Sequence, residues 1–251
     1  MRKPLVAANW KMNKTVGESL EFARAFTPLV AALRGADIVV CPPYTSFSAL
    51  QSIWAGKNII LGAQNIFWEK EGAFTGEISG PMLLSAGCRY VLVGHSERRR
   101  LLGEKDETVN KKLIAAVSAG LIPILCVGET LRERENKRAF QVIKKQLDKG
   151  LENVSWPGSE WAIAYEPVWA IGTGVNANPE DAQEMAAYIR MRMKKRFSKE
   201  QAASVRILYG GSVNEDNAGG FLDREDIDGA LVGGAGLIVR SLAEIVRLAL
   251  K

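Results

Sequence analysis

The sequence has few of the residues and segments that mark several classes of protein. Its three cysteines, Cys41, Cys88 and Cys126, are odd in number and lie far apart in the chain, so they predict neither a disulfide framework nor a zinc site. No apolar run approaches the roughly 20 residues needed to span a bilayer, and the start of the chain lacks the apolar segment of a secretory signal. We therefore expect a cytoplasmic protein that does not enter a membrane.

Linkers and segregated charge are also scarce. No proline- or serine-rich linker divides the 251 residues, and a hydrophobic content of 47% is enough for one large core. The net charge is +5, but lysine and arginine are interleaved with acids, as in residues 133–135. The two basic clusters, 98–100 and 194–196, carry no interleaved aromatic residues, so nucleic-acid binding stays a minor hypothesis.

The sequence instead repeats a strand followed by a helix at a spacing of very roughly 30 residues, the length of a βαβ unit. Apolar runs predict strands at 4–9, 38–41, 59–63, 90–93, 122–127, 161–165, 206–209 and 230–232. Further segments predict helices at 16–33, 45–54 with Thr45 as its N-cap, 130–147 and 178–196. Length and pattern match an α/β fold in which eight parallel strands, surrounded by helices, form a single (β/α)8 barrel domain over residues 1–251.

A carboxylate stands at the end of the sixth predicted strand. Glu166 precedes Pro167, which disfavours a helical conformation at the glutamate, and an apolar segment leads from there to Gly172 and Gly174. This combination predicts a general base beside an apolar lid that closes between flexible ends. The alternative is a buried structural glutamate followed by a hydrophobic loop packed on the surface.

Polar residues follow two other predicted strands. Asn9 and Lys11 come at the end of the first, and His95, the only histidine of the chain, comes after the fourth. A barrel collects catalytic groups at the carboxyl ends of its strands, so we expect these side chains beside Glu166. Taken singly, they also fit a turn amide, a solvated lysine and a structural histidine.

Two further features suggest binding. Glycines follow the seventh strand before Ser212 and the eighth strand at Gly233 and Gly234, where backbone amides can approach a phosphate closely. Each pair alone would indicate only a tight turn. The long segment 67–79, with Thr75 near its centre, is either a surface excursion or a protrusion that docks into another surface.

Three of these motifs together resemble the triosephosphate isomerase family. They are Asn-x-Lys at 9–11, Gly-His-Ser-Glu-Arg at 94–98 and Ala-Tyr-Glu-Pro-Val-Trp-Ala-Ile-Gly-Thr-Gly at 164–174. The resemblance covers essentially the whole chain. It implies a TIM barrel and the interconversion of dihydroxyacetone phosphate and D-glyceraldehyde 3-phosphate through an enediolate, in glycolysis and gluconeogenesis, with no cofactor and no metal.

The resemblance also implies roles for particular residues. Glu166 is the base, His95 the electrophile, Lys11 a source of positive potential, and Asn9 a second group at the enediolate oxygens. Glu97 and Ser96 support them, Glu97 beside the lysine. The phosphate-binding residues are Gly172, Ser212, Gly233 and Gly234. The loop around Thr75 enters a neighbouring subunit, which implies a homodimer.

Two departures from the family pattern remain, and two other readings compete. Gly174 is followed by Val175 and Asn176 at the second hinge of the lid, where the family usually has lysine and a small or hydroxylated residue. Leu102 stands where an aromatic is common in the family, a deviation that we assign to packing. The chain could instead be another phosphate-binding barrel enzyme or a catalytically silent barrel. A turnover assay separates the silent barrel from the isomerase.

Overall fold

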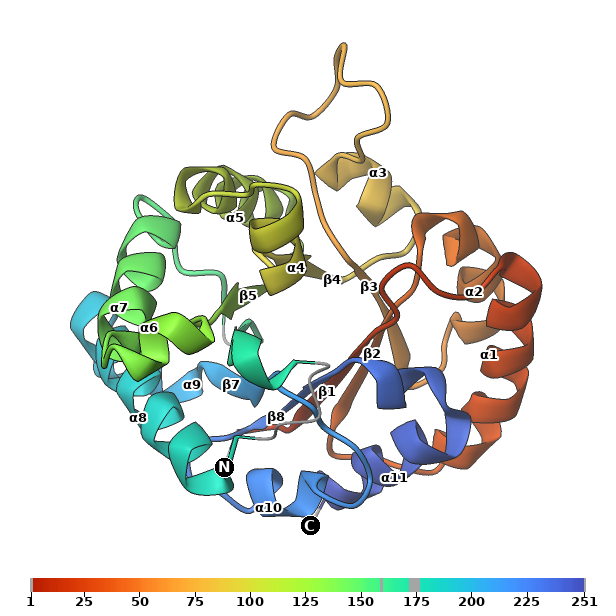
Figure 1. Ribbon diagram of the computed structural model, residues 1–251. Helices are drawn as coiled ribbons and strands as arrows, with labels where there is room; N and C mark the ends of the chain where they lie inside the picture. Colours follow the sequence, from red (N-terminus) through yellow and green to blue (C-terminus); the bar gives the residue numbers. More distant parts are fainter. Residues whose placement is uncertain (1, 159, 172–176, 251) are drawn as a thin grey trace.

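The computed structural model describes residues 2–158, 160–171 and 177–250. Within them, eight parallel strands pair in sequence order, and β8 returns to β1 to close a barrel (Figure 1). The strands are β1 Leu5–Asn9, β2 Asp37–Cys41, β3 Ile59–Ala63, β4 Tyr90–Val93, β5 Ile122–Val127, β6 Ala162–Tyr165, β7 Arg206–Tyr209 and β8 Gly229–Val232. The predicted barrel and its strand positions are thereby confirmed.

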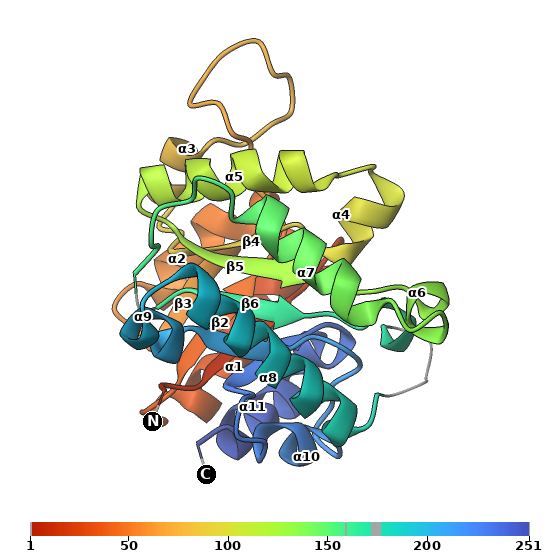
Figure 2. The ribbon, with the colours of Figure 1, turned by 90° about the vertical axis from the view of Figure 1, so that its left-hand side faces the viewer.

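Helices surround the barrel on its outside (Figures 1 and 2). They are α1 Val16–Val30, α2 Phe47–Trp54, α3 Gly80–Ser85, α4 Ser96–Leu101, α5 Asp106–Ala119, α6 Leu131–Glu135, α7 Ala139–Gly150, α8 Pro179–Arg196, α9 Lys199–Ser204, α10 Ala218–Leu222 and α11 Val239–Leu248. Single 3₁₀ turns occur at η1 Tyr44–Ser46, η2 Val168–Ala170 and η3 Gly234–Leu237. No helix of the described residues is long and apolar enough to cross a membrane.

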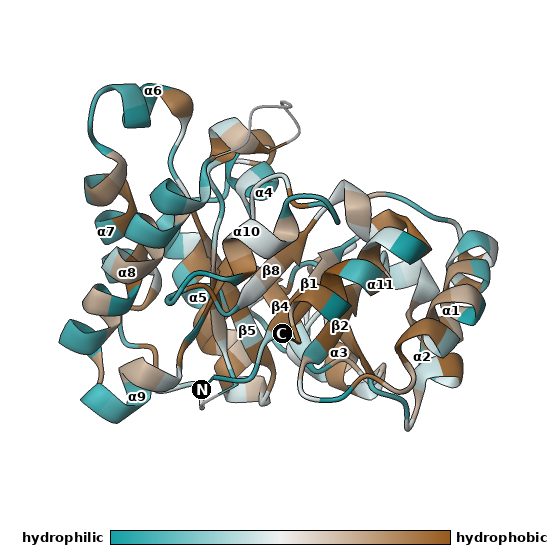
Figure 3. Cartoon of the chain, turned by 90° about the horizontal axis from the view of Figure 1, so that it is seen from below, coloured by the Kyte–Doolittle hydropathy of each residue, from teal (hydrophilic) through white to brown (hydrophobic). Residues whose placement is uncertain are grey.

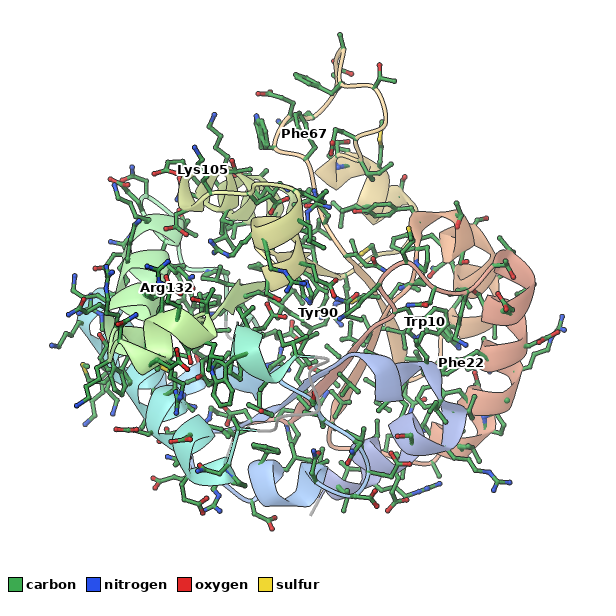
Figure 4. The ribbon with its side chains drawn as sticks, viewed as in Figure 1. Trp10, Phe22, Phe67, Tyr90, Lys105 and Arg132 are labelled. Carbon is green, nitrogen blue, oxygen red and sulfur yellow. The ribbon has the colours of Figure 1, made fainter. Side chains whose placement is uncertain are left out.

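The hydrophobic core lies between the strands and the inner faces of the helices. Hydrophobic colours concentrate on the strands, and hydrophilic ones on the outer helix surfaces (Figure 3), because helices cover the outer face of a parallel barrel while side chains fill its interior. Trp10 shows the contact between the two layers: its ring meets Phe22 of α1 with centroids 4.9 Å apart (Figure 4). The three cysteines are buried and unpaired, and Cys126 of β5 is fully buried.

Two helix predictions were wrong in detail. The expected helix 130–147 is two helices, α6 and α7, because Lys137 takes a left-handed conformation (φ 56°) that ends the first. Thr45 lies inside η1 instead of capping α2, whose N-cap is Ser46 without a side-chain hydrogen bond.

Asn178 caps α8 by accepting a hydrogen bond from the Asp181 N–H at 2.6 Å.

Buried charges join the amino-terminal ends of the strands at the bottom of the barrel. The Asp37 carboxylate pairs with Lys3, and its Oδ2 accepts hydrogen bonds from Arg206 Nη1 at 2.6 Å and from the Tyr90 hydroxyl at 3.1 Å. Arg206 Nη2 also donates to the Tyr90 oxygen at 2.9 Å. Burial acts to raise the pKa of Asp37, but Lys3 and Arg206 outweigh it and hold that pKa below its usual value.

Candidate active site

Asn9 and Lys11 are positioned by a tight turn at the end of β1. Lys11 has a left-handed backbone (φ 53°), and its N–H donates to Asn9 Oδ1 at 3.0 Å. Gln64, which follows β3, fixes this turn: its Nε2 donates to the Lys11 carbonyl at 2.8 Å and to the Cys41 carbonyl at 2.9 Å. The Asn9 amide and the Lys11 ammonium are therefore attached to a backbone that hydrogen bonds hold in place. Sequence reasoning gave Gln64 no role.

His95 is placed by the turn from β4 into α4. Gly94 takes a positive φ of 76°, and His95 becomes the N-cap of α4, with Nδ1 accepting the Glu97 N–H at 3.3 Å. A nitrogen that accepts a hydrogen bond carries no proton, so the proton of the neutral ring resides on Nε2. Nε2 lies 2.9 Å from Glu166 Oε1 and donates to it.

Glu166 follows β6 and is 1% exposed. Its Oε1 meets His95, and its Oε2 accepts the Ser96 N–H at 2.9 Å. Burial acts to raise the pKa of Glu166, but His95 and the Ser96 N–H lower it more, so the group is a carboxylate ready to accept a proton. Burial acts in turn to lower the pKa of His95, but the Glu166 charge raises it above its usual value.

Glycines make room for Glu166 on two sides. A Cβ atom on Gly128 would stand 1.7 Å from the Glu166 carbonyl oxygen, and one on Gly210 would stand 3.0 Å from Glu166 Cγ. Only glycine fits the first position. The sixth strand end is thus packed closely against the turns that follow β5 and β7.

The Lys11 ammonium is held by Glu97, with Nζ 2.6 Å from Oε1. Both side chains are partly exposed, so the pair leaves the cation accessible. Glu97 does not pair with Arg98, its neighbour in the sequence, because Arg98 pairs with Glu104 instead. The contact between Glu97 and the lysine is the one that the resemblance implied.

A small cavity of about 20 Å³ lies between these groups, room for about one water molecule. Its lining residues come from the ends of several strands and are Asn9, Lys11, His95, Glu166, Ile171, Gly210, Gly211, Leu231, Val232 and Gly233. The four predicted catalytic residues and Gly233 thus share one cavity. The Glu166 carboxylate accepts the hydrogen bond that His95 Nε2–H donates. A ligand that enters the cavity must replace Glu166 as the acceptor of this hydrogen bond.

The other predicted phosphate-binding residues are placed less directly. Both the N–H and the hydroxyl of Ser212 bind the Ala170 carbonyl, at 3.0 and 2.8 Å. Gly234 begins η3 beside Gly233, whereas Gly172, with the hinge residues Val175 and Asn176, falls outside the described residues.

Two predictions concern the outside of the molecule. Thr75 lies in the exposed loop that projects beyond α3 and α5, away from the cavity (Figures 1 and 2). Leu102 is 64% exposed, so the prediction that it packs within the chain is wrong. The residue ends α4 as its C-cap and turns outward into solvent.

Glu129 is a buried group that sequence reasoning did not single out. Its Oε1 accepts hydrogen bonds from the Trp169 indole at 2.9 Å and the Tyr165 hydroxyl at 3.0 Å. Arg134 lies over the Trp169 ring, 4.9 Å from its centroid. The carboxylate thus anchors η2, which follows Glu166. The sequence feature that could have identified Glu129 is its position just beyond β5, because Glu166 likewise stands just beyond β6.

Known proteins share both sequence and structure with this chain. A family model described as triosephosphate isomerase matches residues 4–249. A triosephosphate isomerase of Endomicrobium trichonymphae is 52% identical over 98% of this chain and 99% of its own length, and one of Moorella thermoacetica is 50% identical over 98% of each. The crystal structure of triosephosphate isomerase from Bartonella henselae, 40% identical, matches with a TM-score of 0.90 over 99% of this chain and 100% of its own. The chain belongs to the triosephosphate isomerase family.

Proposed function

We propose that this chain interconverts dihydroxyacetone phosphate and D-glyceraldehyde 3-phosphate, a step of glycolysis and gluconeogenesis, with Glu166 as its base and without a cofactor. Family membership supports the reaction. The observation that supports the base is the buried Glu166 carboxylate, held 2.9 Å from the Nε2 of the only histidine at the ends of the strands. A carboxylate with a lowered pKa is ionised at neutral pH and accepts a proton from carbon.

The proton moves between neighbouring carbons of the substrate. Glu166 removes it from the carbon beside the carbonyl, the C–H electron pair forms the double bond of the enediolate, and the carbonyl oxygen takes the negative charge. The proton of the neighbouring hydroxyl then moves to that oxygen. When Glu166 returns its own proton to the former carbonyl carbon, a carbonyl forms at the carbon that first lost the proton, which completes the isomerisation. His95 Nε2–H, which donates to Glu166 in this structure, donates to the substrate oxygen that gains negative charge.

Lys11 and Asn9 stabilise the same charge. Lys11 contributes positive potential from a position that Glu97 holds at 2.6 Å. Asn9 Oδ1 is engaged by the Lys11 N–H, which leaves the amide Nδ2 as the donor for a substrate oxygen. These groups are in place before the substrate binds, so little reorganisation accompanies charge development.

Amides near Gly172, Ser212, Gly233 and Gly234 hold the phosphate dianion. Gly233 supports this assignment because it lines the cavity with Lys11. To bind the phosphate, Ser212 must first release its two hydrogen bonds to the Ala170 carbonyl. We assign to the segment after Glu166 the role of a lid that excludes water and protects the enediolate from losing phosphate.

The protein is proposed to act as a cytoplasmic homodimer through the loop around Thr75. Exposed apolar side chains lie near Lys11 and Glu97 in the sequence: Met12 is 96% exposed and Leu101 is 67% exposed, and a subunit interface would cover them. Light scattering at micromolar concentration tests the dimer. Thr75→Arg should shift the mass toward a monomer, whereas Arg24→Thr, a change on the exposed outer surface of α1, should leave it unchanged.

The assay that tests the reaction follows both directions with purified protein beside Glu166→Asp. Withdrawing the carboxylate by about one methylene should lower turnover by orders of magnitude through misplacement alone. Glu152→Asp, the same change at an exposed position, should keep wild-type turnover. A wild-type protein that binds phosphate ligands without turnover would be a silent barrel and would contradict the proposal.

A further inference from the structure

A second cleft, of about 610 Å³, opens on the outside of the barrel between α4–α5 and α6–α7, where Figure 1 shows β5 between these helices. This volume lies in the range of small-molecule sites. Ser96, Gly128 and Glu166 contribute to its lining. The cleft therefore reaches the outer side of the groups that hold the base, while the catalytic cavity lies on their inner side.

The two banks of this cleft carry unpaired cations. Arg100 and Lys105 stand on the α4–α5 bank, and Arg138 and Lys145 stand on the α7 bank. All four are exposed. Within the described parts of the chain none of the four forms an ion pair, since the ion pairs of these helices involve other residues.

Most other charged groups of the cleft already have partners. Arg99 binds Asp106 at 2.6 Å and the Gly94 carbonyl at 2.7 Å. The Glu133 carboxylate accepts from Thr130 at 2.8 Å, and Glu104 pairs with Lys112 and Arg98. Glu107 and Glu133 are the lining acids for which the described residues provide no ion-pair partner, and Glu133 is engaged only by Thr130. Four cations without an ion pair thus face two such carboxylates.

We propose that this cleft binds a small anion with two phosphate groups, one on each bank, and that the bound anion lowers turnover without competing with the substrate. Cations on facing banks favour a ligand with two anionic ends, and charge-assisted hydrogen bonds to phosphate are among the stronger polar contacts. The mixed lining lacks an aromatic platform for stacked bases, which favours a small polyanion over nucleic acid.

Contacts through the floor of the cleft connect this site to the base. Gln146 of α7 binds the Gly128 N–H at 2.8 Å and the Gly128 carbonyl at 2.9 Å. Gly128 packs against the Glu166 backbone, and the Ser96 N–H binds Glu166 Oε2. An anion that joins the two banks restrains the two groups that hold Glu166, namely Gly128 and the Ser96 N–H. Its negative charge also disfavours the carboxylate form of Glu166. Turnover therefore falls while substrate binding is kept.

Inorganic pyrophosphate is the probe, used without divalent cations and at fixed ionic strength. Calorimetry of the wild type should show two sites, one being the catalytic cavity and the other the cleft. In steady-state kinetics, pyrophosphate bound in the catalytic cavity should raise KM, and pyrophosphate bound in the cleft should lower kcat. The double variant Arg138→Ala/Lys145→Ala should lose the cleft site, with binding weakened about tenfold or more, and keep the effect on KM.

The control is Arg132→Ala/Lys149→Ala, which removes the same charge from exposed positions of α6 and α7 that do not line the cleft. It should bind pyrophosphate at both sites as the wild type does. Purely competitive inhibition of the wild type would overturn the proposal. So would an unchanged kcat effect in the cleft variant, or an equal loss of binding in the control, which would indicate attraction by net charge alone.

Discussion

The two ends of the barrel both bury charged groups, yet they use them differently. At the amino-terminal end, Asp37 is paired with Lys3 and accepts hydrogen bonds from Arg206 and Tyr90. At the carboxyl-terminal end, Glu166 meets His95 beside a cavity. The first carboxylate is fixed by two cations. The second is held by an imidazole and a backbone N–H, and a substrate oxygen can take over the contact with the imidazole.

This difference teaches that burial of charge does not by itself mark an active site. Asp37 and Glu166 are 6% and 1% exposed and both have lowered pKa values. What separates them is the exchangeable partner and the adjoining space. Substitutions at the two ends should therefore separate activity from stability.

The largest effect is expected at the carboxyl-terminal end. Glu166→Gln keeps the shape and a hydrogen-bonding oxygen but removes the base, so kcat should fall by about 10² to 10⁴. Because the partners of Glu166 are an imidazole and a backbone N–H instead of a buried arginine, the free energy of unfolding in urea should change by less than about 1 kcal/mol. A stability loss as large as that of an Asp37 variant would erase the distinction between the two ends.

The opposite result is expected at the amino-terminal end. Asp37→Asn leaves the buried Arg206 without its anion, which should lower the free energy of unfolding by about 3 kcal/mol or more. The value of kcat/KM for the folded protein should stay within about twofold, because the chemistry occurs at the other end. Urea unfolding and the isomerase assay on one preparation give both numbers, and a large drop in kcat/KM would refute the separation.

Acid should remove the stability that Asp37 contributes. Its folded pKa lies below the unfolded value of about 3.9, so the contribution is fully present above that pH and is lost as the pH falls through the folded pKa. The difference in unfolding free energy between the wild type and Asp37→Asn should therefore be constant from pH 7 to 5 and narrow below about pH 4. A gap that widens on acidification would reverse the assigned sign.

The smallest effect is expected for an exposed pair on α7. Lys144 and Asp148 form an i, i+4 ion pair at 2.8 Å with both side chains largely in solvent. Lys144→Ala should change the free energy of unfolding by less than about 0.5 kcal/mol and leave kcat unchanged. Denaturant unfolding at low and high salt checks this, and a loss near that of Asp37→Asn would show that burial is not what matters.

The strands and their ends were predictable from local patterns. The apolar runs that end at Asn9 and before His95 and Glu166 have strand length, and parallel strands bring their carboxyl ends to one level. The break at Lys137 was not predictable in this way, because no glycine or proline marks it and a lysine rarely takes a positive φ.

Groups that act through distant partners were also missed. Gln64 binds the Lys11 carbonyl across 53 positions, and Glu129 binds Trp169 across 40. Such contacts exist only after the barrel closes, so no local pattern contains them. The contacts of the two groups follow from the fold, whereas Glu166 was predicted to be the base from a short motif.

The contact between His95 and Glu166 also has a consequence for dividing the gene. A cut at Gly120, between α5 and β5, places Asn9, Lys11 and His95 on one polypeptide and Glu166 on the other. Neither fragment then carries both the proposed proton acceptor and its proposed electrophile. Turnover should return only when the halves reassemble, which would make the enzyme a catalytic reporter of its own complementation.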